Sequence, residues 1–138
     1  MIQRQHVIAY VWTAVIFLAL DAVWLSVMAE RLYRPALGRL MLDKFDYAPA
    51  AVFYPLYVLG IVVFAVAPSI ESGRWTTALG LGALFGLVAY ATYDLTNQAT
   101  LRDWPLRVTL ADLCWGTFAT AAAAALASRA TAWVVDKL

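Results

Sequence analysis

The sequence has few of the residues that hold common cofactors or keep a protein in water. Only 14% of its 138 residues are charged, and it contains one cysteine, Cys114, and one histidine, His6. A single cysteine excludes a disulfide within the chain and a zinc site built on thiolates. A lone histidine near the N-terminus disfavours a haem ligand and histidine acid–base chemistry. Neither haem nor thiolate zinc is therefore expected, and any other cofactor stays unknown.

Several functional motifs are missing as well. The formal net charge is +1 and no block of Lys and Arg residues occurs, so nucleic acid is not an expected partner. The G-x-S-x-G motif and the phosphate-binding glycine loop are absent, as is the paired-aspartate signature of phospholipid alcohol-phosphotransferases. Whether the protein is an enzyme stays open.

Hydrophobic residues dominate instead. They make up 64% of the chain, and the mean hydropathy of +0.73 is typical of a protein whose solvent is lipid. A helix needs about 20 mostly apolar residues to span a bilayer, and residues 7–29, 47–67, 75–101 and 106–128 satisfy this. Because the connections are short, the sequence predicts one all-α domain over residues 1–138, a four-transmembrane-helix, antiparallel up-down bundle.

The connection over residues 30–44 mixes apolar and aromatic side chains with Arg and Lys. This pattern predicts a short interfacial helix after the first span, with a plain basic loop as the alternative. Six basic residues flank the first and third connections, namely Arg31, Arg34, Arg39, Lys44, Arg102 and Arg107. Only four basic residues lie on the other face of the membrane. The chain is expected to be a bacterial inner-membrane protein, and the excess predicts that both of its termini lie outside the cytoplasm.

The third predicted span contains Gly82 and Gly86, a small-xxx-small pair. Such pairs let two helix backbones approach closely. The favoured interpretation is packing inside the bundle, and the alternative is a homo-oligomer formed through this pair.

Three carboxyl groups lie inside the predicted spans: Asp21, Asp94 and Asp112. At 1.5 Å per residue, each lies about 10–12 Å from the same membrane face. A charged group at that depth is costly and usually marks a functional site that faces the bundle interior. If a metal binds, these three acids are its predicted ligands.

Polar and aromatic residues at helical spacing accompany the acids. Together they predict one pocket, formed by Asp21, Trp24, Tyr54, Tyr90, Tyr93, Asp94, Asn97, Asp112 and Trp115. Arg102 and Arg107 are the expected charge partners; with them, the cluster could instead be a structural ion-pair network. Asp-x-x-Trp occurs twice, at residues 21–24 and 112–115, which hints at an inverted repeat but also arises by coincidence.

Three strings carry a family resemblance: LDAVWL at 20–25, GLVAYATYDLTN at 86–97, and the segment from WPL at 104–106 to DLCWG at 112–116. They resemble a bacterial four-helix inner-membrane family known as domain of unknown function 2177. The resemblance covers nearly the whole chain and implies four spans, but it implies no activity.

Three functional hypotheses follow. The preferred one is a small polytopic membrane protein whose pocket binds a lipid-like or small polar ligand, with modification of that ligand left open. The alternatives are a small proton- or cation-coupled transporter and a non-catalytic scaffold subunit. Membrane lipid is the expected partner in the first case.

Overall fold

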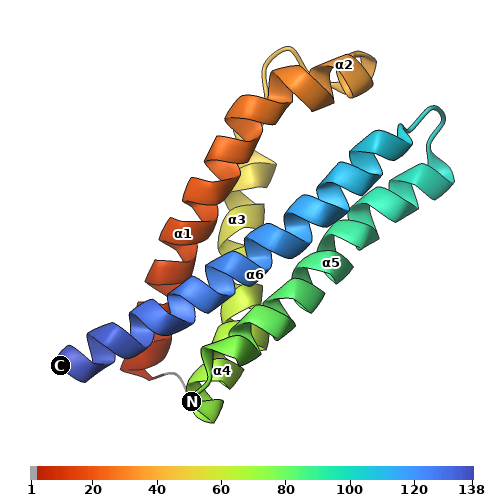
Figure 1. Cartoon of the computed structure of the whole chain (residues 1–138). Coiled ribbons are helices and arrows are strands. Elements are labelled where there is room, and N and C mark those ends of the chain that lie inside the picture. The colour runs from red at the N-terminus through yellow and green to blue at the C-terminus, as the bar shows by residue number, and fades with distance from the viewer. Residues whose placement is uncertain (1–2) are drawn as a thin grey trace.

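A computed structural model of the chain describes residues 3–138, and all regular structure in that part is helical. Four long helical rods form a bundle, and both chain ends lie at the same end of it (Figure 1). The elements are α1 (Arg4–Met28), η1 (Ala29–Tyr33), α2 (Arg34–Leu37), η2 (Gly38–Leu40), α3 (Tyr47–Ile61), η3 (Val62–Val66), α4 (Ala67–Ser72), α5 (Trp75–Thr100) and α6 (Leu106–Lys137).

The fold class predicted from the sequence is confirmed. Four continuous helical stretches are long and apolar enough to cross a membrane: Arg4–Leu40, Tyr47–Ser72, Trp75–Thr100 and Leu106–Lys137. The first helix begins earlier than predicted and the second and fourth run on past the predicted ends. The extra residues include Glu71, Arg129 and Lys137, so the hydropathy pattern detects the apolar part of each helix but not its polar ends.

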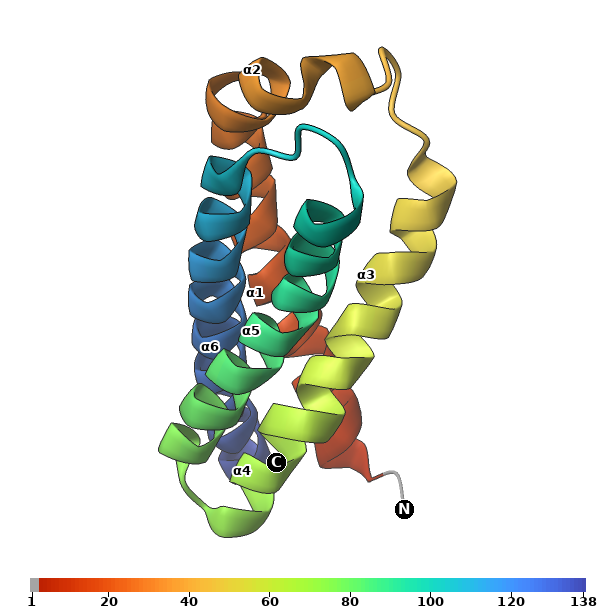
Figure 2. The same ribbon diagram turned by 90° about the vertical axis from the view of Figure 1, so that its right-hand side faces the viewer.

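The first connection is helical as far as Leu40, which contradicts the plain-loop alternative. After α1, a π-helical turn and two short helical segments bend across the end of the bundle (Figure 2). Leu32 of η1 is buried there in a small apolar cluster with Trp104 and Val108, next to the start of α6. An ion pair of 3.5 Å between Arg39 and Asp103 joins this connection to the loop before α6.

Helices α5 and α6 pack along much of their length because small residues face each other. A Cβ atom on Gly82 would lie 2.9 Å from the Cβ of Ala124, and one on Gly86 would lie 2.2 Å from the carbonyl oxygen of Gly116. Only glycine allows so close an approach. The Gly82–Gly86 pair therefore packs against α6 of the same chain. A homo-oligomer stays a prediction.

Helix α3 behaves differently from α5 and α6. Its continuation η3 packs against α5, whereas its first half diverges from α5 towards the end where α2 lies (Figure 2). Pro55 lies inside α3 and cannot donate a backbone hydrogen bond, and η3 is a π-helical turn; both features bend helices. The divergence leaves room between α1, α3 and α5 at the level of the aspartates.

We predict that Gly86→Ala lowers the free energy of unfolding by about 1–3 kcal/mol, because the new methyl group overlaps the α6 backbone. Gly80 is the matched control: nothing lies within 4 Å of a Cβ placed there. Gly80→Ala should raise stability by up to about 1 kcal/mol through helix propensity. Thermal unfolding in detergent, followed by circular dichroism, measures both variants, and equal effects would contradict the close α5–α6 packing.

Candidate functional site

A cavity of about 350 Å³ lies between the helices at the level of the aspartates. It receives side chains from α1, η1, α3, α5 and α6, so every one of the four long helical stretches contributes to it. Its lining is Asp21, Trp24, Leu25, Tyr33, Phe53, Tyr54, Tyr57, Ala89, Tyr90, Tyr93, Asp112 and Trp115. Apart from Leu25 and Ala89, every lining residue is an acid or an aromatic.

Asp21 is buried on α1 and receives two donors from other helices. The hydroxyl of Tyr54 on α3 donates to Oδ2 over 2.5 Å, and the indole Nε1 of Trp115 on α6 donates to Oδ1 over 3.2 Å. One carboxyl group thus holds α1 against both α3 and α6.

Asp112, buried on α6, is bound in a related way. The hydroxyl of Tyr33 donates to its Oδ1, and the same hydroxyl accepts a hydrogen bond of 2.9 Å from Nε1 of Trp24. The Trp24 and Trp115 rings stack, with centroids 4.6 Å apart and planes 8° from parallel. Each indole therefore serves the aspartate of the opposite helix, Trp115 directly and Trp24 through Tyr33. The repeated Asp-x-x-Trp pattern corresponds to this reciprocal arrangement.

Asp94 is the most deeply buried of the three acids. It is 0% exposed, and neither of its carboxyl oxygens accepts a hydrogen bond from any donor in residues 3–138. Asp112, on the neighbouring helix α6, lies close to it. Because a carboxylate only accepts hydrogen bonds, an ionised Asp112 cannot serve as its donor.

Packed aromatic rings form the rest of the wall. Tyr57 is stacked against Phe53, with ring centroids 5.3 Å apart, and its hydroxyl is 2.8 Å from that of Thr120. Tyr90 meets Tyr57 edge-on. A Cβ on Gly116 would lie 2.2 Å from the Tyr90 ring, so the absence of a side chain at position 116 is what admits this ring to the cavity wall.

Most residues predicted from the sequence line the cavity: Asp21, Trp24, Tyr54, Tyr90, Tyr93, Asp112 and Trp115. Asp94 and Asn97, one helical turn apart on α5, are outside the lining; Asp94 is buried and Asn97 is half-buried. Tyr33 was missed although it bridges Trp24 and Asp112. Its sequence signal, an aromatic residue in the amphipathic segment after the first span, indicates a membrane surface as readily as a pocket.

The cavity contains acids but no basic side chain. Arg102 and Arg107 are exposed, and neither forms an ion pair with Asp21, Asp94 or Asp112. Within the described part of the chain the ion pairs are Glu30–Arg34 at 3.0 Å and Arg39–Asp103 at 3.5 Å, both outside the cavity. Residues 3–138 also contain no group of three His, Cys, Asp or Glu side chains arranged to hold a metal ion. Asp21 and Asp112 are therefore satisfied only by neutral donors, and Asp94 has no donor among the described residues.

These features define a small multi-pass helical membrane protein with an acidic, aromatic cavity between its helices. The chain belongs to the family described as "Predicted membrane protein (DUF2177)", whose family model matches residues 6–129. No curated protein and no solved structure matches the chain.

We predict that Tyr33→Phe lowers the free energy of unfolding by about 1–3 kcal/mol, because it leaves Asp112 without a donor and the Trp24 indole without an acceptor. Tyr47 offers a control, since it is exposed; Tyr47→Phe should change stability by less than about 0.5 kcal/mol. Chemical unfolding in mixed micelles measures both. A Tyr33→Phe protein as stable as Tyr47→Phe would contradict the bridging role.

Proposed function

We propose that the cavity is a binding site for a lipid-like molecule that enters from the membrane. The observation that carries the proposal is the lining itself: carboxyl, hydroxyl and indole groups gather in a hollow whose remaining wall is aromatic and apolar. Ligand sites are usually concave, mostly apolar and equipped with a few placed polar groups. A polar head would lie against Asp21 and Asp112, and an apolar chain would extend away from them.

The rim of the cavity supports entry from the side. Leu25, Phe53 and Tyr93 belong to the lining, yet each is between 43% and 58% exposed. They come from α1, α3 and α5, the helices around the space that the divergence of α3 leaves open (Figure 2). Large apolar side chains at an opening suit contact with acyl chains better than contact with water.

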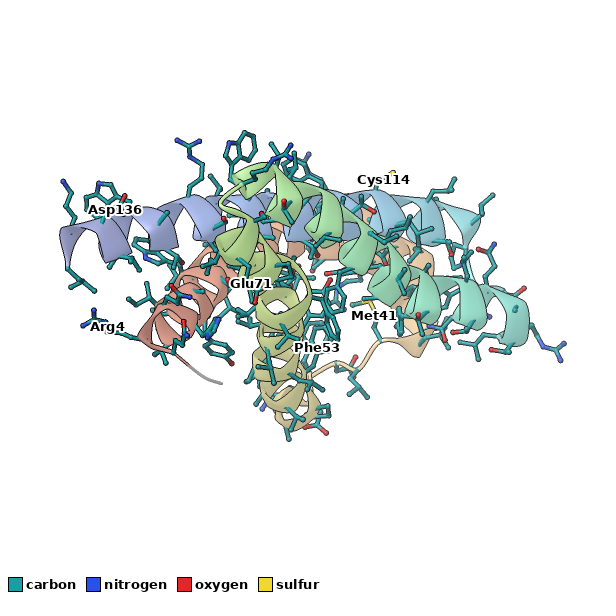
Figure 3. The ribbon with its side chains drawn as sticks, turned by 90° about the horizontal axis from the view of Figure 1, so that it is seen from below. Arg4, Met41, Phe53, Glu71, Cys114 and Asp136 are labelled. Carbon is teal, nitrogen blue, oxygen red and sulfur yellow. The ribbon has the colours of Figure 1, made fainter. Side chains whose placement is uncertain are left out.

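Figure 3, which looks along the bundle from the end where α4 lies, has aromatic side chains crowded between α3 and the other helices. The labelled Phe53 lies on α3 at this crowded face, whereas Cys114 lies on the far side of α6. These aromatic side chains therefore lie on the side of the bundle that α3 covers.

The orphan carboxyl group of Asp94 argues against a purely structural network, in which every buried polar group should be paired.

The unpaired carboxyl group of Asp94 also favours a second candidate function, proton-coupled transport. A hydrogen-bonded series runs from Trp24 through Tyr33 to Asp112, and Asp94 adjoins its end. Proton relays in membrane proteins use such carboxyl groups.

A cavity-filling substitution tests lipid binding without removing any polar group. Ala89 lines the cavity, and we predict that Ala89→Phe loses the lipid that the wild-type protein retains in mild detergent, because the ring occupies the same volume. Ala99 is exposed on the same helix, and Ala99→Phe should keep the lipid. Native mass spectrometry detects the bound mass.

A wild-type protein that carries no lipid and takes none up from a bacterial lipid extract would overturn the proposed function. Proton flux in liposomes that disappears in Asp94→Asn would then support the transport alternative.

We further propose a location in the bacterial inner membrane, with both chain ends outside the cytoplasm. The excess of basic residues at the end of the bundle that carries α2 supports this orientation, and both termini lie at the opposite end (Figure 1). Alkaline phosphatase fused after Leu138 should be active, because this enzyme folds only outside the cytoplasm. The same fusion after Lys44 should be inactive, and the reverse result would invert the orientation.

A further inference from the structure

We propose that the head group bound in this cavity is an ammonium group, so that the ligand is an amine-bearing or quaternary-ammonium amphiphile. This inference rests on the proposed function and adds the chemical class of the ligand. It follows from the juxtaposition of uncompensated carboxyl groups and aromatic rings in one cavity.

The charge balance gives the first step. Asp21 and Asp112 line the cavity, and the donors that reach them, from Tyr54, Trp115 and Tyr33, are all neutral. Asp94 adjoins them with no donor of its own. No Lys, Arg or His side chain is part of the lining. An ionised carboxyl group in a low-dielectric site requires a nearby positive charge or a proton, and an ammonium ligand would supply that charge.

The composition of the wall gives the second step. Trp24, Trp115 and Tyr90 line the same cavity as the two acids. Indole and phenol rings attract cations through their electron-rich faces, and clusters of such rings recognise quaternary ammonium groups. Each such contact contributes about 0.5–2 kcal/mol, more when water is excluded. Rings and carboxyl groups thus favour the same kind of head group.

The same features disfavour an anionic head group. Phosphate and sulfate recognition relies on Arg, Lys or clustered backbone N–H donors. Arg102 and Arg107, the basic residues nearest in sequence to Asp94 and Asp112, are exposed and outside the lining, as are Arg31 and Arg34 beside Tyr33. A phosphate placed beside Asp21 and Asp112 would meet like charge with no compensation. A neutral alcohol could donate a hydrogen bond to these carboxyl groups, so it is the essential comparison.

The test compares amphiphiles that share a twelve-carbon chain and differ only in the head group: dodecylamine, dodecyltrimethylammonium, dodecanol and dodecyl phosphate. Each is titrated into the wild-type protein in nanodiscs of neutral lipid, and native mass spectrometry counts the bound molecules. We expect at least one of the two ammonium compounds to bind tenfold or more tightly than dodecanol. Dodecyl phosphate should bind more weakly than dodecanol.

Variants assign the preference to the acids. Asp21→Asn and Asp112→Asn should each reduce the ratio of ammonium to dodecanol affinity at least tenfold. Asp43 is an exposed acid outside the cavity, and Asp43→Asn should leave the ratio unchanged. The wild-type comparison needs no variant, so the proposal stays testable if an aspartate variant fails to fold.

The outcomes separate the two proposals. Equal binding of all four compounds, or preference for dodecyl phosphate, overturns the ammonium inference and leaves the lipid site intact. Equal binding of this kind is also the result expected if protons alone neutralise the acids. Failure of every amphiphile to bind overturns the lipid site as well. A preference for dodecylamine over the trimethylammonium compound assigns the main contact to the carboxyl groups, and the opposite order assigns it to the rings; both support the proposal.

Discussion

Carboxyl groups placed inside an apolar helical bundle must find donors, and the arrangement of the helices depends on how Asp21 and Asp112 find theirs. Asp21 on α1 is reached from α3 and α6, and Asp112 on α6 is reached from η1, the turn after α1. An unsatisfied buried acceptor costs about 1–3 kcal/mol and more when it is charged. The rotations of α1, α3 and α6 about their axes are therefore restricted by these polar pairs.

The bundle combines one tight contact with one open one. Glycines on α5 and alanines on α6 bring two backbones together, while Pro55 and the π-helical turn η3 accompany the divergence of α3. Close packing holds Asp94 and Asp112 near each other on neighbouring helices. Divergence opens the space that Tyr54, Tyr57 and Phe53 only partly fill. The cavity is a product of both, since neither feature alone would place acids beside an unfilled volume.

The chemistry of the cavity is restricted by what does not line it. Acids and aromatic rings without any basic side chain can accept hydrogen bonds, share protons and attract cations, but they offer little to an anion. The family to which the chain belongs is described only as a predicted membrane protein. The lining therefore carries the functional argument, and it supports the proposed cationic head group over an anionic one.

The four spans could be predicted from the sequence because hydropathy is a local property, and each apolar run is long enough to cross a bilayer by itself. The cost of burying acids such as Asp21, Asp94 and Asp112 in such runs likewise indicated where a site would lie. Only the tertiary structure decided which donor serves which acid. It also showed that Gly82 and Gly86 face α6, that Tyr33 folds back onto Asp112, and that Arg102 and Arg107 point away. These outcomes depend on how helices rotate and approach one another, and contacts between residues such as Tyr33 and Asp112, far apart in the chain, leave no periodic signal in the sequence.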